Sequence, residues 1–349
     1  MKSMHAAVWG DGGTLRHVEL ERPEPGPGEV RVRVRACGIC GSDLHLRNTG
    51  FVTKGVAPGH ELAGVVDAVG EGVADHAVGT AVAVEPLRSC GSCTECRKGL
   101  DALCPSGRLL GVHEHGGFAE HVVVPAGRAF PVPGDLDPRV AALAEPTAVV
   151  VRGLRRGGLA AGGRVLVLGA GTLGLLSILA ARALGAREVW ISARHAAQAK
   201  LAGELGAARV LAERDAEPQA LARAARKEPF DVVVETVGGT ADTLNAAGAA
   251  VRRGGTVAVV GMFVAPVALD TLPLLLKEAT LAWSYCYGRT DDPCEFAAAT
   301  ALLSAERERA ARLTTHTVPL ADALRAFELA ADRKSGAIKV SVVPSVSPE

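Results

Sequence analysis

The sequence feature that most constrains the fold is a short apolar segment followed at once by a glycine-rich turn and a helical run. Residues 164–168, RVLVL, have the character of a continuous apolar strand buried in a parallel β-sheet. The turn GAGTLG fills residues 169–174, and the run LLSILAARAL leads on to Gly185. A G-x-G-x-x-G pattern alone is a weak signal. Placed between a strand and a helix, it is typical of dinucleotide-binding βαβ units.

Each glycine of this turn has a separate expected role. We expect Gly169 to make the tight turn, Gly171 to let the backbone approach a pyrophosphate, and Gly174 to let the helix pack against the strand. The N-terminus of the helix then faces the phosphates with its partial positive charge. The candidate coenzyme contacts in the turn are Gly169, Gly171, Thr172, Leu173 and Gly174.

Strand-like and helical segments continue to alternate after the turn. The further strand candidates are residues 188–192, 231–235, 256–260 and 280–285. Repeated βα units of this kind predict a doubly wound parallel sheet, so the expected fold class is α/β. The turns at 236–239 and 261–263 follow strands, where a coenzyme would lie, so Val237 and Gly261 are further candidate contacts.

The end of the second strand bears on the choice of coenzyme. An NAD-specific site has an acidic residue there that accepts from the ribose 2′-hydroxyl. This strand ends instead in Ser192, Ala193, Arg194 and His195, with no carboxylate at its tip. Ser192 could hydrogen-bond a 2′-phosphate, Arg194 could pair with it in forked geometry, and His195 is a neighbouring candidate contact. We therefore predict that NADP is preferred over NAD. The alternative is that Arg194 is merely exposed and that selectivity is loose.

Four cysteines in the first third of the chain have the spacing of a metal site. They are Cys90, Cys93, Cys96 and Cys104, and four thiolates can enclose a tetrahedral Zn²⁺. Such a zinc has no open coordination position, so it would hold a loop in place rather than do chemistry. Pro105 after the last cysteine is also found in ferredoxin-type sequences. An iron–sulfur cluster or a lobe without metal therefore stays open as an alternative to structural zinc.

A second group of ligand-type residues lies within residues 37–61. Cys40 and His45 belong to the segment GICGSDLH, and His60 and Glu61 end the segment PGHE. A thiolate, an imidazole and a carboxylate form the ligand set of a catalytic zinc, with one position left for substrate. Each residue alone is weak support, because a lone cysteine is more often a small buried hydrophobic residue than a ligand.

Together, GICGSDLH and PGHE resemble the medium-chain, zinc-dependent alcohol and polyol dehydrogenases, and the four-cysteine segment resembles the structural-zinc lobe of that family. The resemblance implies two zinc ions per chain. It also implies a GroES-like, irregular β domain at residues 1–150 and 288–349, with the zinc lobe at 88–105, and a Rossmann domain at 151–287. Within the first domain, residues 29–35, EVRVRVR, alternate as a half-buried strand with its arginines in water.

Glu145 interrupts the apolar segment AALAEPTAVVV, where a buried carboxylate is costly unless it is paired or bound to a metal. Glu-Pro at this place resembles the sorbitol, butanediol and threonine dehydrogenase branch. By that resemblance, Glu145 completes the catalytic zinc site with Cys40, His60 and Glu61. Which glutamate binds zinc directly is left open: we favour Glu145, and the two could exchange during turnover.

The resemblance further implies reversible hydride transfer between an alcohol and the nicotinamide, with zinc as a Lewis acid. It assigns Ser42 to hydrogen-bond the substrate oxygen and His45 to carry its proton onward to solvent. Asp43 would orient His60 through the ring nitrogen that does not face the metal.

The expected substrate is a small-molecule secondary alcohol or ketone: a polyol, a cyclitol, a sugar-like compound or an amino alcohol. Lys339, in GAIKVSV, is expected to contact the coenzyme pyrophosphate or to be an exposed strand lysine, and Phe118 to help wall the substrate pocket. Two alternatives stay open. One is a zinc-free, NADPH-dependent quinone or enone reductase, and the other is a non-enzymatic nucleotide-binding protein of the same fold.

Composition argues against several other classes. The 38 basic and 38 acidic residues give a formal net charge of zero, so neither nucleic acid nor an anionic membrane is an expected partner. Hydrophobic residues make up 48% of the chain, enough for a packed core. No apolar run reaches the ~18 residues of a membrane span, and the N-terminus has no signal-peptide pattern, so we expect a cytoplasmic protein. The resemblance implies a homodimer or homotetramer.

Overall fold

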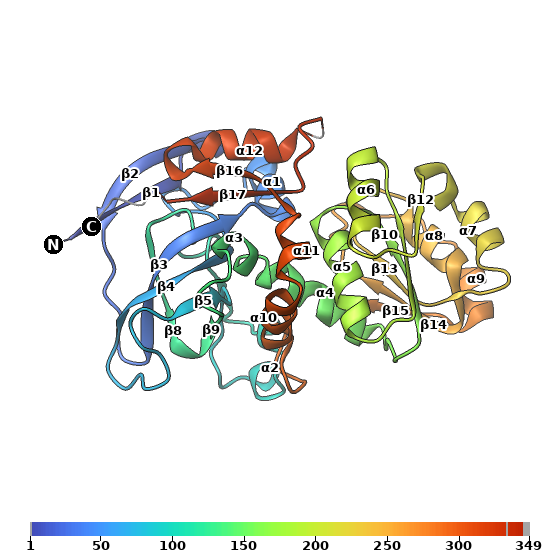
Figure 1. The fold of residues 1–349 in the computed structure, drawn as a ribbon, viewed down its shortest axis with the longest axis horizontal. Helices are drawn as coiled ribbons and strands as arrows, with labels where there is room; N and C mark the ends of the chain where they lie inside the picture. Colours follow the sequence, from blue (N-terminus) through green and yellow to red (C-terminus); the bar gives the residue numbers. More distant parts are fainter. Residues whose placement is uncertain (1, 333, 345–349) are drawn as a thin grey trace. The chain divides into compact units, whose positions relative to one another are not determined.

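The structure is a computed structural model that describes residues 2–332 and 334–344 (Figure 1). The chain divides into two compact units. Unit 1 comprises Met1–Glu145 and Gly288–Glu349, and unit 2 comprises Pro146–Tyr287. Within the described ranges, no helix has both the length and the apolar character that crossing a bilayer requires.

Unit 1 contains most of the antiparallel β-structure, together with short helices (Figure 1). Its strands are β1 (Ser3–Trp9), β2 (Leu15–Glu21), β3 (Glu29–Gly38), β4 (Glu61–Val69), β5 (Ala81–Val84), β6 (Leu87–Arg88), β7 (Arg108–Leu109), β8 (His121–Pro125), β9 (Ala129–Pro131), β16 (Thr314–Pro319) and β17 (Lys339–Val343). Its helices are α1 (Gly41–Thr49), α2 (Thr94–Arg97), α3 (Pro138–Ala141), α10 (Glu295–Ala305), α11 (Arg307–Ala311) and α12 (Ala323–Ala331). Helix α4 (Ala144–Arg156) begins in unit 1 and continues in unit 2.

The main sheet of unit 1 has seven strands, in the order β16-β17-β3-β4-β5-β9, with β8 also paired to β3. Strand β3 therefore lies inside the sheet and not at an edge. Its arginines do not form the solvated face that the alternating sequence predicted, because Arg31 is buried and pairs with Asp67 at 2.8 Å and with Glu24 at 2.6 Å. Buried arginines are tolerated when their charge is paired in this way. The expectation of a row of arginines in water is wrong for Arg31.

The core of unit 1 is built from apolar side chains of β1, β3, β4, β5, β8 and α12. Phe118 is fully buried in it, and its ring packs edge-on against Phe327, with 5.8 Å between ring centroids. Packing of this kind contributes to stability beyond the buried area. The expectation that Phe118 walls a substrate pocket is corrected: its ring is enclosed by the core.

Unit 2 alternates strands with helices along the chain (Figure 1). Its strands are β10 (Arg164–Leu168), β11 (Glu188–Ser192), β12 (Arg209–Leu211), β13 (Phe230–Glu235), β14 (Val251–Val259) and β15 (Thr280–Trp283). Its helices are α5 (Thr172–Ala183), α6 (Ala196–Glu204), α7 (Pro218–Ala224), α8 (Thr243–Ala250) and α9 (Thr271–Lys277).

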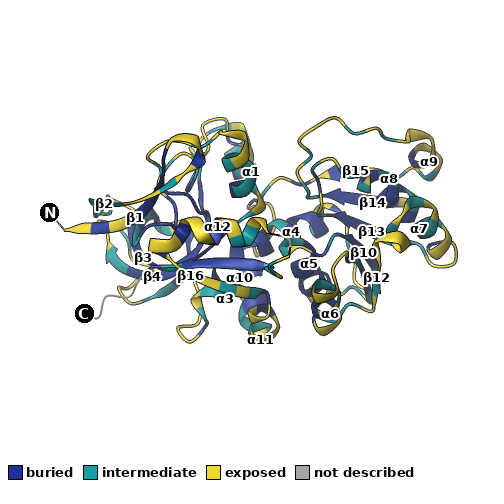
Figure 2. Cartoon of the chain, turned by 90° about the horizontal axis from the view of Figure 1, so that it is seen from above, coloured by how far each residue is buried: buried dark blue, intermediate teal, exposed yellow. Residues whose placement is uncertain are grey.

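The six strands of unit 2 form one sheet in the order β12-β11-β10-β13-β14-β15, and every neighbouring pair is parallel. Counted from β10, this is the order 3-2-1-4-5-6 of a doubly wound dinucleotide-binding sheet. All five residues of β10 are buried, as its apolar sequence predicted. Figure 2 shows strand β13 largely in the buried colour and α9 largely exposed. The predicted doubly wound α/β fold is confirmed.

Candidate functional site

Three ligand-type side chains converge in unit 1. Cys40 stands at the N-cap of α1, two residues after the end of β3, while His60 and Glu61 lie where β4 begins. The thiol of Cys40, a ring nitrogen of His60 and a carboxylate oxygen of Glu61 all lie within 4.8 Å of one another. His60 and Glu61 are buried and Cys40 is half-buried. A separation of this size is suited to one metal ion between the three groups.

Asp43, in the first turn of α1, contacts two members of this group. Its Oδ2 accepts the backbone N–H of Cys40 at 3.0 Å, and its Oδ1 lies 3.4 Å from His60 Nδ1. Burial lowers the pKa of His60, but Asp43 and Cys40 outweigh burial, so the pKa lies well above its ordinary value. Because Nδ1 faces Asp43, Nε2 is the nitrogen left for a metal, which is the usual arrangement around a ligand histidine.

Lys339 also belongs to this site, at the start of β17. Its ammonium donates to Glu61 Oε2 at 2.5 Å and to the carbonyl of Ile39 at 2.9 Å. Burial opposes the charge, but Glu61 and Cys40 favour it and raise the pKa of Lys339. The alternative of an exposed strand lysine is wrong, because Lys339 is only 3% exposed. The Lys339 ammonium, which was predicted to contact the coenzyme pyrophosphate, forms an ion pair with Glu61 instead.

Glu145, in the first turn of α4, is buried near the same group. Burial, together with the charges of Glu61 and Asp43, raises the pKa of Glu145 to about 7, although His60 and Lys339 act in the opposite direction. Among the described residues, the set within 4.8 Å contains Glu61 and not Glu145. The structure therefore brings three of the four predicted ligands together and places Glu145 within electrostatic reach of them.

Ser42 and His45 lie on α1, directly after Cys40, and both are half-buried. The helix ends at Gly50, whose φ of 73° is the left-handed conformation that favours glycine. Both residues therefore lie on the helix that Cys40 caps. Their roles in hydrogen-bonding the substrate and passing on its proton stay predictions.

The four cysteines of the second candidate site lie together, with their sulfur atoms within 4.8 Å of one another. Backbone N–H groups of Cys93 and Cys96 donate to the sulfurs of Cys90 and Cys93, both at 3.4 Å. Hydrogen bonds from the backbone of Ser92 and Cys93 lower the pKa of Cys90 to about 6, which favours a thiolate. The geometry is that of a closed four-thiolate metal site.

A buried ionic network that the sequence did not reveal anchors this cysteine lobe. Arg128 pairs with Glu85 and, at 2.5 Å, with Asp101, which lies between Cys96 and Cys104. Arg289 adds a second cation, 2.7 Å from Glu85. Since each charge has opposite partners, the network can be buried without leaving an uncompensated ion.

The glycine-rich turn of unit 2 has the close contacts that its sequence predicted. Gly169 has a φ of 98°, and a Cβ there would lie 2.6 Å from the side chain of Val237. At Gly174 a Cβ would overlap the carbonyl of Gly169, so the helix can approach only because this residue is glycine. A Cβ on Gly171 would meet no atom within 4 Å, so this face of the turn is open to a ligand.

Two of the three predicted 2′-phosphate contacts, Ser192 and Arg194, are already engaged with protein groups. Ser192 Oγ accepts the backbone N–H of Gly169 at 2.9 Å, which ties the end of β11 to the glycine-rich turn. Arg194 forms an ion pair with Glu213, and both side chains are 56% exposed. His195 is the N-cap residue of α6 and is exposed. The carboxylate that pairs with Arg194 comes from 19 residues further along the chain.

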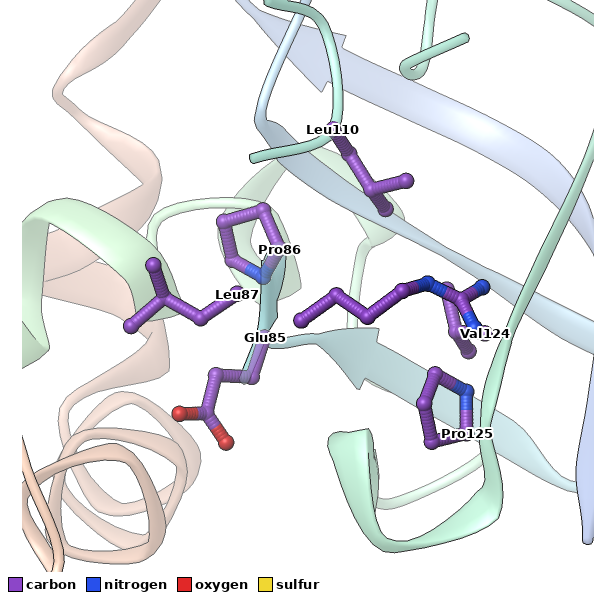
Figure 3. Close-up of a pocket in the computed structure, with 7 residues that line it drawn as sticks. Glu85, Pro86, Leu87, Leu110, Val124 and Pro125 are labelled. Atoms are coloured by element: carbon purple, nitrogen blue, oxygen red, sulfur yellow. The ribbon is translucent and has the colours of Figure 1, made fainter. Parts of the chain in front are cut away.

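Two hollows of unit 1 share no lining residue with the Cys40 group. One is lined by Glu85, Pro86, Leu110, Val124 and Pro125, among others (Figure 3). It leaves no room for a water-sized molecule. We assign no function to it.

Comparison with known proteins decides the family. Residues 26–134 match the alcohol dehydrogenase GroES-like domain, and residues 172–305 match the zinc-binding dehydrogenase family. L-Galactonate-5-dehydrogenase of Escherichia coli (strain K12) is 33% identical over 298 residues, which are 84% of this chain and 85% of that protein. D-Altritol 5-dehydrogenase of Agrobacterium fabrum is 34% identical, covering 93% of this chain and 95% of that protein. The chain belongs to the zinc-dependent medium-chain alcohol/polyol dehydrogenase family.

Solved structures agree with this assignment. The crystal structure of a Sinorhizobium meliloti protein bound to NADP superposes on this dehydrogenase with a TM-score of 0.89. The two are 32% identical, and the match covers 99% of this chain and 100% of the other. The resemblance inferred from GICGSDLH and PGHE is confirmed, as is the combination of a GroES-like domain with a Rossmann-type sheet. This dehydrogenase is an oxidoreductase that acts on a small-molecule alcohol.

Three features of this dehydrogenase were not predicted from the sequence. They are the Lys339–Glu61 pair, the Arg194–Glu213 pair and the network around Arg128. The sequence feature that could have indicated such a pair is a single charged residue within an apolar strand. Charged residues are rarely buried unless they are paired. Lys339, within KVSVV, is such a residue.

Proposed function

We propose that this dehydrogenase depends on a catalytic zinc held by Cys40, His60 and one of the two glutamates, Glu61 and Glu145. The observation that carries the proposal is the convergence of the Cys40, His60 and Glu61 ligand atoms within 4.8 Å. A buried set of thiol, imidazole and carboxylate fits Zn²⁺ and leaves one coordination position for an alcohol. The site residues thus suit the group that the family implies.

Two observations bear on the choice of glutamate. Glu61 belongs to the tight ligand group, but its Oε2 accepts from Lys339. Glu145 lies outside that group, yet it is buried beside the same charges. We infer that Glu145 is the resting ligand, with Glu61 held by Lys339 and able to exchange with it during turnover.

Bound zinc would supply a Lewis acid for the alcohol oxygen, and the nicotinamide would supply the hydride acceptor. Asp43 Oδ2 accepts the backbone N–H of Cys40, and Asp43 Oδ1 lies 3.4 Å from His60 Nδ1, so this one carboxylate is placed to orient two of the ligand residues. In the proposal, Ser42 hydrogen-bonds the substrate hydroxyl, and His45 on the same helix passes its proton to solvent.

The proposed coenzyme is NADP, in preference to NAD. The support is that β11 ends without an acidic residue and is followed by Arg194. Arg194 is paired with Glu213, but an exposed ion pair is weak. A doubly bonded arginine–phosphate contact is stronger, so Arg194 can leave Glu213 for a 2′-phosphate. The NADP bound to the S. meliloti relative is consistent with this choice.

The proposed substrates are polyols and sugar-like secondary alcohols. The relatives named above oxidise, by their names, the 5-position of L-galactonate and of D-altritol.

We further propose a structural zinc on Cys90, Cys93, Cys96 and Cys104, and assembly as a homodimer or homotetramer. The cytoplasmic location stays a prediction from the sequence.

The test is a coenzyme-dependent activity assay. Purified protein is offered alditols and sugar acids with NADP⁺ and with NAD⁺, and the matching keto compounds with NADPH, alongside quinone and enone acceptors. We expect turnover of secondary alcohols that a zinc chelator abolishes and added zinc restores. Reduction of quinones or enones that survives the chelator would contradict the proposal.

A further inference from the structure

The end of β13 carries a buried carboxylate that the proposed chemistry does not use. Glu235 has no exposed surface. Its Oε1 accepts three hydrogen bonds: from the N–H of Val237 at 2.8 Å, from the N–H of Gly238 at 3.0 Å, and from Thr243 Oγ1 at 2.8 Å. A carboxylate that accepts several backbone N–H groups is a strong local anchor. One oxygen therefore fixes the turn after β13 and the first residue of α8.

The backbone of Glu235 reaches the next turn as well. Its carbonyl accepts the N–H groups of Val260 and Gly261, both at 2.9 Å. The two turns are also joined directly, because Gly239 N–H donates to the carbonyl of Met262 at 2.8 Å. Residues 236–239 and 261–263 thus form one hydrogen-bonded assembly around Glu235.

Glycines make this close approach feasible. A Cβ on Gly261 would overlap Glu235 Oε2 and would lie 2.5 Å from the backbone nitrogen of Gly238. Gly238 has a φ of 60°, which side chains rarely adopt, and a Cβ there would lie 2.6 Å from the nitrogen of Met262. Within the described part of the chain, Glu235 Oε2 has no hydrogen-bond partner. It packs against Gly261, where there is no room for a side chain.

The position of this assembly in the sheet indicates what it faces. In a sheet of order 3-2-1-4-5-6, a dinucleotide lies outside the carboxyl ends of the strands, with one mononucleotide on each half. The glycine-rich turn and Arg194 belong to the half formed by β10, β11 and β12, which takes the adenosine side. The turns after β13 and β14 then face the nicotinamide side. Val237 and Met262 are 49% and 54% exposed there, as apolar contacts for a ring would be.

We propose that Glu235 is a positioning residue for the nicotinamide half of the coenzyme. It touches no coenzyme atom itself. It acts by holding the turns 236–239 and 261–263 in register, so that Val237 and Met262 are presented together. This inference rests on the proposed function, because it requires a nicotinamide coenzyme on this sheet.

The binding test compares Glu235→Ala and Glu235→Gln with a matched control. Asp231→Ala removes a carboxylate from the amino end of the same strand, where it accepts the N–H of Arg164 at 2.8 Å and pairs with Arg252 at 2.7 Å. Dissociation constants are measured for NADPH and for 2′-phospho-ADP-ribose, which lacks the nicotinamide. We expect Glu235→Ala to weaken NADPH by about tenfold, or about 1.4 kcal/mol, and 2′-phospho-ADP-ribose by less than about twofold. Glu235→Gln, which keeps one acceptor, should recover part of the loss and serves if the alanine variant does not fold. Asp231→Ala should leave the ratio of the two constants unchanged.

Amide hydrogen exchange separates failure of this inference from failure of the proposed function. In the Glu235 variants, amide exchange should become faster in residues 236–239 and 261–264 but not in the glycine-rich turn. In Asp231→Ala, exchange in residues 236–239 and 261–264 should not become faster. If exchange rises as expected but the wild type binds no nicotinamide coenzyme, the proposed function fails. If the wild type binds NADPH and the Glu235 variants weaken both ligands equally or neither, Glu235 is not a positioning residue and the inference is overturned.

Discussion

Lys339 Nζ lies 2.5 Å from Glu61 Oε2, and both side chains are buried although 278 positions separate them in the chain. Gly38 makes room for the pair, since a Cβ there would overlap Glu61 Oε2 and lie 3.1 Å from Lys339 Cδ. The ammonium compensates the negative charge that Glu61 brings beside Cys40 and Glu145. A carboxylate buried without this cation would be strongly disfavoured.

The first prediction is that this pair is coupled in stability. Lys339→Met should lower the free energy of unfolding by about 3 kcal/mol, because it leaves Glu61 buried and unpaired. The double variant Lys339→Met with Glu61→Gln should recover a large part of that loss. Urea unfolding of the metal-free protein completes the double-mutant cycle. Lys54→Met, which breaks an exposed pair with Asp11, is the control and should change little. Strictly additive losses would contradict the coupling.

The second prediction concerns coenzyme selectivity at Arg194 and Glu213. Arg194→Ala should weaken NADPH by about tenfold, through the loss of a charge-assisted contact, while NADH changes by less than about twofold. Glu213→Gln should act in the opposite direction and tighten NADPH, because it frees Arg194 and removes a charge that repels the 2′-phosphate. Fluorescence titration with both coenzymes measures this. Equal losses for the two coenzymes in Arg194→Ala would show that this arginine does not contact a 2′-phosphate.

The third prediction separates the two metal groups. Cys93→Ser should remove the lobe zinc, so that the metal content falls from about two ions per chain to about one, matching the two ligand groups. The midpoint of thermal unfolding should fall, since a structural zinc contributes folding energy. Cys294→Ser is the control, because this cysteine caps α10 and belongs to neither group. An unchanged metal content in Cys93→Ser would show that the lobe holds no zinc.

The fourth prediction is a pH effect on stability at Asp67. Burial raises the pKa of Asp67, but hydrogen bonds to His121 and Arg31 outweigh burial and hold the pKa below its ordinary value. A lowered pKa gives stability that is present above the unfolded value near 3.9 and is lost as the pH falls through the native value. Asp67→Asn should therefore cost about 2 kcal/mol at pH 7, and this cost should shrink progressively as the pH falls below about 4 towards the native pKa.

Urea unfolding of Asp67→Asn between pH 3 and pH 7 checks the pH effect. Asp135→Asn, whose carboxylate is exposed and pairs with Arg307, serves as the control. A penalty in Asp67→Asn that does not change with pH would show that its charge is not what stabilises the fold.

What the sequence predicted well depends on residues close together in the chain. The glycine-rich turn could be predicted because the roles of Gly169 and Gly174 are set by backbone geometry within six residues. The four cysteines are equally local, and their spacing alone brings the sulfurs together. His60 and Cys40 are 20 positions apart, and here the family motif supplied what spacing could not.

What the sequence did not predict depends on pairing between distant segments. Lys339 reaches Glu61 only because β17 pairs with β3 in the sheet that also contains β4. Arg31 was expected to be exposed to water, because the alternating sequence of a strand does not reveal how many other strands pair with it. Glu213 comes to Arg194 from the turn after β12, so no acid is visible at the tip of β11 itself.

The catalytic-zinc site is tested most directly by the zinc content of Cys40→Ala, measured together with the alcohol dehydrogenase activity of this variant. We predict that the wild type holds about two zinc ions per chain and Cys40→Ala about one, in keeping with the two ligand groups. Activity with NADP⁺ should fall by at least about 10³-fold, the equivalent of several kcal/mol of lost Lewis-acid stabilisation. A variant that keeps both zinc ions and its turnover would contradict the catalytic-zinc site at Cys40, His60 and the neighbouring glutamates.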